Sequence, residues 1–388
     1  MHHPFLSLRE SNWFKLICGA SYQHLPTIRG LVLSYALAGA DCVDIAADPA
    51  IVSVARSALD VADQIRADVA DQGAVAANRP WLMVSLNDGD DPHFRKAVFD
   101  PAYCPPECSR PCESICPAHA IALAPDIAQS EGVIQERCYG CGRCLPVCPI
   151  QQITTQSYTT NLETLVSSVL PHVDAVEIHT QVGRSEAFET VWKAIAPFVS
   201  QLKLVAVSCP DGEDLIAYLT HLYDIMCPVP ELLIWQTDGR PMSGDIGNGT
   251  THASIRLAQK VLAANIPGYV QLAGGTNAHT VPKLHQLQLL NVKNRNTKNR
   301  LAGVAYGSYA RSLLDPVFHA ADIAYAGSGF QLEKHPTLLW QGVRTAHQLV
   351  AQLKGGLTDV QSPFNGRGHS LVPPFISPNS PNKIQPVV

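Results

Sequence analysis

Eight of the twelve cysteines in this 388-residue chain lie in two short runs between residues 104 and 148. The second run has the spacing C-x2-C-x2-C-x3-C-P and consists of Cys138, Cys141, Cys144 and Cys148. In proteins with two iron–sulfur clusters, three thiolates at this spacing bind one cluster and the fourth thiolate binds the other cluster. The spacing therefore predicts an iron–sulfur site.

The first run has the wider spacing C-x3-C-x3-C-x3-C-P and consists of Cys104, Cys108, Cys112 and Cys116. If the fourth ligands are exchanged between the runs, two quartets result. The first quartet is Cys138, Cys141, Cys144 and Cys116. The second quartet is Cys104, Cys108, Cys112 and Cys148. We expect [4Fe-4S] clusters, and the wider gaps leave either a [4Fe-4S] or a [3Fe-4S] centre for the second quartet.

Zinc is the alternative occupant, because quartets of cysteine thiolates with two-residue gaps also bind Zn²⁺. Zinc does not require the third thiolate at this spacing, nor the interleaved fourth. The segments AIAL (120–123) and VIQERCYGCGRC (133–144) also resemble the small paired strands that cover clusters in bacterial ferredoxins. These features favour iron–sulfur clusters over zinc.

Apolar strand-like segments alternate with helical segments on both sides of the cysteine runs. The expected strands are Phe14–Gly19, Cys42–Ala46, Trp81–Leu86, Ala175–Ile178, Leu204–Val207, Leu232–Trp235, Tyr269–Leu272 and Gly303–Tyr306. Eight strands, each followed by a crossover segment, predict an α/β fold of the (β/α)8 TIM-like barrel type. The cysteine runs then form an inserted two-cluster ferredoxin-like α+β module after the third strand. An open α/β sheet with the same insertion is the alternative.

This organisation predicts four parts of the chain. Residues 1–100 hold the first β/α units and residues 101–155 the iron–sulfur module. Residues 156–354 hold the remaining β/α units. Residues 355–388 are rich in Pro, Gly and Ser and predict an extended tail.

The loops after the expected strands form the mouth of a barrel, where chemistry collects. The polar or Gly positions there are Asp48, Asn87, Asp88, His179, Cys209, Asp238, Arg240, Gly274 and Gly275. The pairs Gly274–Gly275 and Gly307–Ser308 follow the last two strands, where barrels bind phosphate through backbone amides. They are candidate cofactor-binding residues for the phosphate of FMN. Tight turns without a ligand are the alternative reading of these pairs. No catalytic residue is assigned.

Composition excludes several classes of function. The net charge of -5 provides no broad positive field, so nucleic acid is not expected as a partner. Charged residues interrupt every apolar stretch, which predicts no transmembrane segment and no secretory signal. A cytoplasmic location is expected, where clustered cysteines indicate metal rather than disulfides. A local basic run consists of Lys293, Arg295, Lys298 and Arg300, and is read as a solvated loop or a docking patch for an acidic partner.

The chain resembles the LdpA (light-dependent period) family of the cyanobacterial circadian clock input. The resemblance lies in CPPECSRPCESICPAHAI, CYGCGRCLPVCP, IWQTDGRPMSGDIGNGTTHASIRLAQ, VQLAGGTNAHT and an N-terminal segment beginning NWFKLICGASYQHLP. It implies an iron–sulfur protein that reports cellular redox state to the clock. Histidine kinases of the clock input and a core clock protein are the partners that the resemblance implies, together with an electron donor or acceptor.

Two functions follow from these observations. The leading hypothesis is a redox sensor or electron carrier, in which a one-electron change at a cluster alters a nearby loop or partner surface. The alternative is an iron–sulfur oxidoreductase that passes electrons to a flavin or small substrate in the barrel mouth. A third reading is a barrel that only docks proteins. Whether the protein is an enzyme is left open by its sequence.

Overall fold

The structure is a computed structural model. It describes residues 3–19, 25–69, 78–89, 95–116, 120–123, 132–134, 138, 144–157, 162–240, 246–247, 249–290, 300–324 and 331–354. The side chains of 95, 157 and 322–324 are not described. Cys141, three residues of the basic run (293, 295 and 298) and the expected tail at 355–388 lie outside the described residues.

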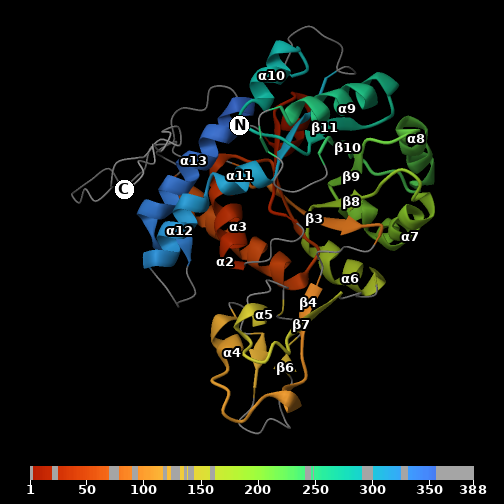
Figure 1. Ribbon diagram of the computed structural model, residues 1–388. Coiled ribbons are helices and arrows are strands. Elements are labelled where there is room, and N and C mark those ends of the chain that lie inside the picture. The colour runs from red at the N-terminus through yellow and green to blue at the C-terminus, as the bar shows by residue number, and fades with distance from the viewer. Residues whose placement is uncertain are drawn as a thin grey trace, which may run out of the picture.

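Eight parallel strands close into a barrel that forms the body of the protein (Figure 1). The strands are β1 (Trp13–Ile17), β2 (Cys42–Ala46), β3 (Trp81–Asn87), β8 (Ala175–His179), β9 (Leu204–Pro210), β10 (Leu233–Asp238), β11 (Tyr269–Ala273) and β12 (Gly303–Tyr306). The barrel closes where Trp13 of β1 pairs with Gly303 of β12. A Cβ atom on Gly303 would collide with the carbonyl of Trp13, so glycine permits this approach. The predicted barrel is confirmed, and an open sheet is excluded by this pairing.

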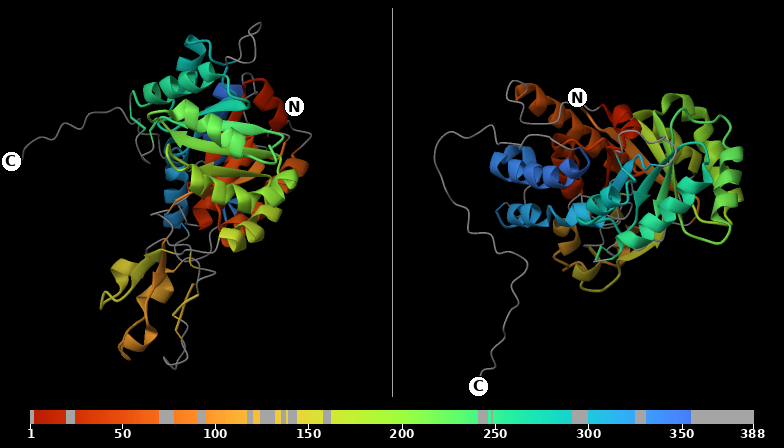
Figure 2. Two further views of the ribbon diagram at one scale, coloured as in Figure 1. Left: turned by 90° about the vertical axis from the view of Figure 1, so that its right-hand side faces the viewer. Right: turned by 90° about the horizontal axis from the view of Figure 1, so that it is seen from above.

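Helices surround the strands on the outside (Figure 2). Those of the barrel are α1 (Pro4–Arg9), α2 (Leu25–Ala38), α3 (Pro49–Asp68), α6 (Leu162–Val169), α7 (Ser185–Ile195), α8 (Leu215–Ile225), α9 (Thr251–Ala264), α10 (Thr280–Gln286), α11 (Ser308–Ser312), α12 (Asp315–Ala324) and α13 (Pro336–Lys354). Helix α2 packs between α3 and α13, which explains why it is buried on nearly all sides. Helix α13, the last helix of the described chain, thereby covers β1 and α2, the first strand and helix of the barrel wall.

The inner face of the barrel changes from apolar to polar along its axis. Side chains at the N-terminal ends of the strands form an apolar layer that α1 covers, and Trp13 and Trp81 pack there with ring centroids 5.6 Å apart. Successive residues of a strand point to opposite faces, so the next inward position lies two residues further on. Two residues beyond the floor, the inward residues are Lys15, Asp44, Glu177, Gln236 and Gln271. On β3 and β9 a second apolar residue, Met83 or Ala206, comes first, and the polar residues Ser85 and Ser208 follow it. The strands therefore enclose a polar centre above an apolar floor.

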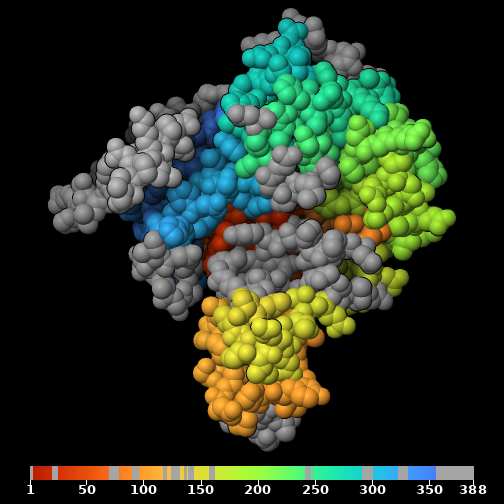
Figure 3. Space-filling model, in the orientation of Figure 1, coloured from red at the N-terminus to blue at the C-terminus, as the bar shows by residue number. Residues whose placement is uncertain are grey.

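The segment after β3 forms a separate lobe at one end of the barrel, shown in orange and yellow in Figure 3. Its elements are β4 (Arg95–Val98), a 3-10 turn (Pro101–Tyr103), α4 (Pro111–Ile115), β5 (Ile121–Ala122), β6 (Gly132–Val133), α5 (Cys144–Val147) and β7 (Thr154–Ser157). Strands β4 and β7 pair in antiparallel fashion and form a stem, while β5 pairs with β6. Strand β5 falls in the first segment that the sequence marked as a paired cluster-covering strand, and β6 overlaps the second segment only at Val133.

The cysteine lobe has a hydrophobic core of its own. That core contains the side chains of Cys112, Cys138 and Cys144 beside Ile121 and Ile153, so the sulfur atoms are part of the packing.

Among the residues that the structure describes, no helix combines the length and the apolar character required to cross a membrane.

Candidate functional site

Cysteines from both runs meet around one small cavity in the lobe. The cavity is lined by Cys104, Cys108, Cys112 and Cys148, together with Phe99, Leu123 and Ile153 among others. Burial, and then the neighbouring thiols of Cys108 and Cys148, raise the pKa of Cys104. Three of these cysteines belong to the first run and the fourth ends the second run. The cavity thus brings together the four cysteines of the second predicted quartet.

Helix α4 presents Cys112 to this cavity and is anchored at both sides. Arg110, with φ of 55°, turns the chain into the helix, and its Nη1 donates to the carbonyl of Leu123 at 2.9 Å. The Glu113 carboxylate accepts the N–H of the same Leu123 at 2.7 Å. The residue before α4 and a residue within it therefore hold Leu123, directly after β5, which fixes Cys112 relative to the rest of the lobe.

Backbone N–H groups point at cysteine sulfurs of the other predicted quartet. The N–H of Ala97 donates to Sγ of Cys138 at 3.4 Å, and the N–H of Ala120 donates to Sγ of Cys116 at 3.2 Å. Cys144 begins α5 and is buried in the same core, whereas Cys141 lies outside the described residues. Hydrogen bonds to sulfur stabilise thiolate charge and are one of the factors that set cluster potentials.

Cys148 has an environment suited to a thiolate. Burial alone would raise its pKa, but the backbone N–H groups of the following residues, 150–153, together bring the pKa of Cys148 below its ordinary value. A thiolate is the form that binds metal. The turn after Cys148 is thus built for a negatively charged sulfur.

The described cysteines surround a space rather than a point. A single Zn²⁺ holds its thiolates about 2.3 Å from one centre. Within the described residues, which do not include Cys141, no group of three or more His, Cys, Asp or Glu side chains is placed to hold a metal ion. The four donors at the cavity are all thiols, the ligand type that iron–sulfur clusters and structural zinc sites share.

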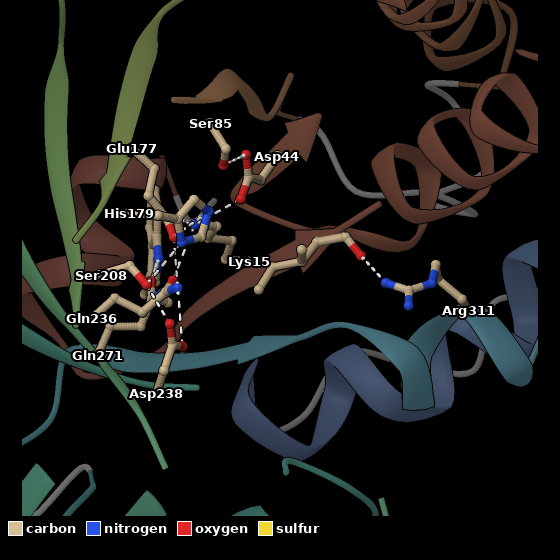
Figure 4. Close-up of polar contacts among 12 residues, drawn as sticks. Lys15, Asp44, Ser85, Glu177, His179, Ser208, Gln236, Asp238, Gln271 and Arg311 are labelled. Atoms are coloured by element: carbon tan, nitrogen blue, oxygen red, sulfur yellow. Dashed lines mark hydrogen bonds and ion pairs between the residues drawn. The ribbon is translucent and has the colours of Figure 1, made fainter. Parts of the chain in front are cut away.

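A second concentration of polar groups fills the centre of the barrel (Figure 4). Lys15 is fully buried; its Nζ forms ion pairs with Glu177 and, at 3.0 Å, with Asp44, and donates to Oε1 of Gln236 at 3.0 Å. Gln236 donates to Glu177 at 2.7 Å and accepts from Gln271 at 2.6 Å. Removing three charges from water costs several kcal/mol per ion before the charges pair. Burying them therefore contributes less to the free energy of folding than apolar side chains at the same positions would.

Above this centre, a more accessible layer faces the barrel mouth. Nδ1 of His179 lies 3.1 Å from Oγ of Ser208, and Ser208 in turn donates to the carboxylate of Asp238. Nε2 of His179 is 3.5 Å from Oε1 of Glu177, which connects the two layers. The side chain of His179 is 35% exposed, so a small molecule entering from the mouth meets this layer first.

The glycine pairs that the sequence proposed for phosphate lie at the mouth. Gly274 and Gly275 have positive φ, and a Cβ on Gly274 would lie 2.8 Å from the backbone N of Arg240. The close approach of the loop after β10 therefore accounts for Gly274. A Cβ on Gly307 would lie 3.5 Å from Nη1 of Arg311, an ordinary contact, and Oγ of Ser308 accepts from Arg311 at 3.0 Å. Binding of FMN phosphate at these four residues stays a prediction.

The other expected mouth residues differ in their hydrogen bonds and in their exposure. Asp48 caps α3, Asn87 accepts the N–H of Gly89 at 3.0 Å, and Asp88 accepts from Thr180. Cys209 is buried, and burial followed by the charge of Asp238 raises the pKa of the Cys209 thiol to about 12. Arg240 is exposed after the end of β10.

Sequence reasoning missed the buried centre. Lys15, Asp44, Ser85, Glu177, Ser208, Gln236 and Gln271 were not proposed as site residues. A signal was present, because most of the strands carry a polar residue in the middle of an apolar run, as in WFKLI, CVDIA and AVEIH. A polar residue in a strand that is buried on both faces indicates an inward group with a partner.

The fold and the site together define a class: a β/α-barrel protein with an inserted iron–sulfur cluster-binding domain. A family model described as the LdpA Fe-S cluster-binding domain matches residues 104–159. A second, described as the Light dependent period A C-terminal domain, matches residues 169–352. The chain is 48% identical over 363 residues to Light dependent period A of Synechococcus elongatus, covering 92% of this chain and 96% of that protein. The chain belongs to the light-dependent period A family.

A solved structure is also similar in shape. The carboxyl transferase domain of Rhizobium etli pyruvate carboxylase, with pyruvate and biocytin, aligns with a TM-score of 0.40 at 11% identity. The alignment covers 89% of this chain and half (50%) of that one.

Proposed function

We propose that this protein is a redox sensor that binds two iron–sulfur clusters and relays cellular redox state to the circadian clock input. The observation that carries the proposal is the cavity shared by Cys104, Cys108, Cys112 and Cys148. It joins cysteines of two separate runs, as the exchange of the fourth ligand between clusters requires. Family membership supports the light-dependent role. Clock input histidine kinases and a core clock protein are the proposed partners.

The lobe's own residues supply what a cluster needs. Thiolates gathered at one cavity repel one another, and bound iron cations remove that repulsion and keep the thiols deprotonated. When bound, each cluster supplies a one-electron change of charge. The lobe is attached to the barrel through the β4–β7 stem, so a charge change there occurs at a defined place beside the barrel. This arrangement suits sensing because one electron alters the field at a fixed surface.

Anaerobic purification followed by iron and sulfide analysis and low-temperature EPR tests cluster binding. We expect two cluster signals from the wild-type protein. Cys148→Ser and Cys112→Ser are expected to lose the same cluster, and each variant should keep about half the iron. Cys144→Ser should lose the other cluster, and Cys227→Ser, which changes an exposed cysteine outside the lobe, should lose neither. If Cys148→Ser removes the Cys144 cluster instead, the exchanged assignment is wrong. Protein that binds zinc but no iron rejects the proposal.

Sensing requires a second experiment. Binding of the proposed partner proteins is measured with oxidised and with dithionite-reduced protein under the same anaerobic conditions. We expect affinity to differ between the two states, and Cys112→Ser serves as the variant with one cluster removed. Equal affinity in both states argues against a sensor.

The polar centre of the barrel favours a second candidate function, an iron–sulfur oxidoreductase acting on a flavin or small molecule at the mouth. Lys15, Glu177 and His179 form a connected polar group at the end of the barrel where enzymes of this fold place their chemistry. Solvent extraction of anaerobically purified protein tests the flavin version, which an extract without flavin rejects.

A further inference from the structure

An ion pair joins the stem of the cysteine lobe to the mouth of the barrel. Lys96 lies on β4, and its Nζ is 3.9 Å from Oδ2 of Asp48, which follows the C-terminal end of β2. The two side chains are 9% and 6% exposed. Water and salt screen buried charges weakly, so this pair acts over a longer distance than a surface pair does.

The same strand contacts a predicted cluster ligand. The N–H of Ala97, the residue after Lys96, donates to Sγ of Cys138. Consecutive side chains of a strand point to opposite faces, and Ala97 faces the core of the lobe while Lys96 reaches Asp48. The N of Ala97 lies 3.4 Å from the Cys138 sulfur, and Lys96 is the preceding residue, so an extended lysine side chain places its charge on the order of 10 Å from that sulfur.

We propose that Lys96 sets the reduction potential of the cluster bound through Cys138, with Asp48 as the opposing charge, and that this pair transmits the cluster's redox state to the barrel mouth. Reduction adds one negative charge to a cluster. A nearby cation favours the reduced state and a nearby carboxylate disfavours it. The inference rests on the proposed function, because it requires a cluster at Cys138.

Transmission follows from the reciprocity of coupled equilibria. If Lys96 stabilises the reduced cluster, the reduced cluster attracts Lys96 and weakens its interaction with Asp48. Asp48 also accepts the N–H groups of Ala50 at 2.8 Å and Ile51 at 3.4 Å, and so caps α3. The first turn of α3 lies at the barrel mouth, and it therefore experiences the redox state of the cluster.

Two single variants with opposite expected effects test the proposal. Reduction potentials of both clusters are measured by EPR of full-length anaerobic protein at a series of poised potentials. Lys96→Met is expected to lower the potential of the Cys138 cluster, because the favourable cation is lost. Asp48→Asn is expected to raise it, because Asn still caps the helix but carries no charge. Each change should shift the oxidised-to-reduced ratio about ten-fold, which is 59 mV for one electron.

Matched controls separate charge from structure. Lys96→Arg keeps the charge and should keep the potential, and the double variant Lys96→Met/Asp48→Asn should return close to the wild-type value. Lys203→Met removes a lysine that is 54% exposed and paired with Asp174 at the opposite end of the barrel, and should change neither cluster. Shifts of the same sign in the two single variants indicate loosening of the stem and overturn the proposal, as does an unchanged potential.

If the Lys96→Met protein fails to assemble a cluster, the Asp48→Asn protein alone tests the inference. A Cys138 cluster whose potential falls or stays unchanged in the Asp48→Asn protein rejects the inference. Amide hydrogen exchange tests transmission. Exchange at Ala50 and Ile51 is expected to be faster in the reduced protein, and equal exchange in both states contradicts that part. A wild-type protein without any cluster signal would instead reject the proposed function, so the two failures are distinguishable.

Discussion

At the scale of single residues, the protein places charge in two different environments. The lobe gathers thiols beside N–H donors, as at Cys138 and Cys148, whereas the barrel buries Lys15 among carboxylates. Both arrangements oppose the ordinary preference of these groups for water. Each therefore has a measurable consequence when one member is changed.

Replacing Lys15 by Met should destabilise the barrel strongly. The change leaves Glu177 and Asp44 buried without their cation, and breaking a buried pair in this way costs about 3–5 kcal/mol. Denaturant unfolding followed by circular dichroism measures the loss. Lys193→Met, which removes an exposed lysine on α7, should change the unfolding free energy by less than about 0.5 kcal/mol. A Lys15→Met protein as stable as wild type would show that the charged centre is not a paired unit.

Cys209 should resist alkylation although it lies at the carboxyl end of β9, next to the mouth of the barrel. Its side chain is 3% exposed and its pKa is raised to about 12, so at pH 9 about one thiol in a thousand is ionised. Iodoacetamide treatment of native protein and peptide mass spectrometry should find Cys227, which is exposed, modified and Cys209 unmodified. Comparable modification of the two at pH 9 would contradict this description of Cys209.

At the scale of elements, loops at the mouth are held by backbone contact as well as by side chains. The turn after β11 lies against the end of β10, and Gly274 is positioned where a Cβ would lie 2.9 Å from the N of Gly239. Oγ1 of Thr250, before α9, donates to the carbonyl of Gly275 at 2.7 Å. The phosphate prediction for this turn thus concerns a segment whose conformation packing already explains.

Gly274→Ala should destabilise the protein, whereas Gly247→Ala should not. The φ of 67° at Gly274 costs a non-glycine residue about 1–3 kcal/mol, and the contact with the loop after β10 adds to that cost. No atom lies within 4 Å of a Cβ on Gly247, so a change within about 0.5 kcal/mol is expected there. Thermal unfolding of both variants measures the difference. Equal stability of the two would mean that the turn relaxes freely.

At the scale of the whole molecule, the lobe is an insertion whose two ends meet. Residues of β4 and β7 pair directly, Val98 with Thr154 for example, and paired Cα atoms lie about 5 Å apart. No described strand of the lobe belongs to the closed barrel. We therefore expect the barrel and the iron–sulfur module to be separate folding units.

Replacing residues 95–157 by a short Gly/Ser linker should leave a folded barrel without iron. We expect cooperative unfolding and a circular dichroism spectrum of an α/β protein, with iron and sulfide lost completely. A matched linker insertion that keeps residues 95–157 controls for the linker itself. Failure of the shortened protein to unfold cooperatively would show that barrel and lobe form one cooperative unit.

Features that are encoded locally could be predicted from the amino-acid sequence. The cysteine spacing predicted an iron–sulfur domain because cluster ligands lie within a few residues of one another, and apolar periodicity predicted eight strands because each strand is buried on both faces.

Contacts between polar residues that are distant along the chain could not be predicted in this way. Lys15 and Glu177 are separated by 162 positions, and Lys96 and Asp48 belong to different parts of the chain. Their contacts depend on barrel closure and strand register, which spacing along the chain does not specify. A residue type shows that a buried charge needs a partner, whereas the partner is chosen by the three-dimensional path of the backbone.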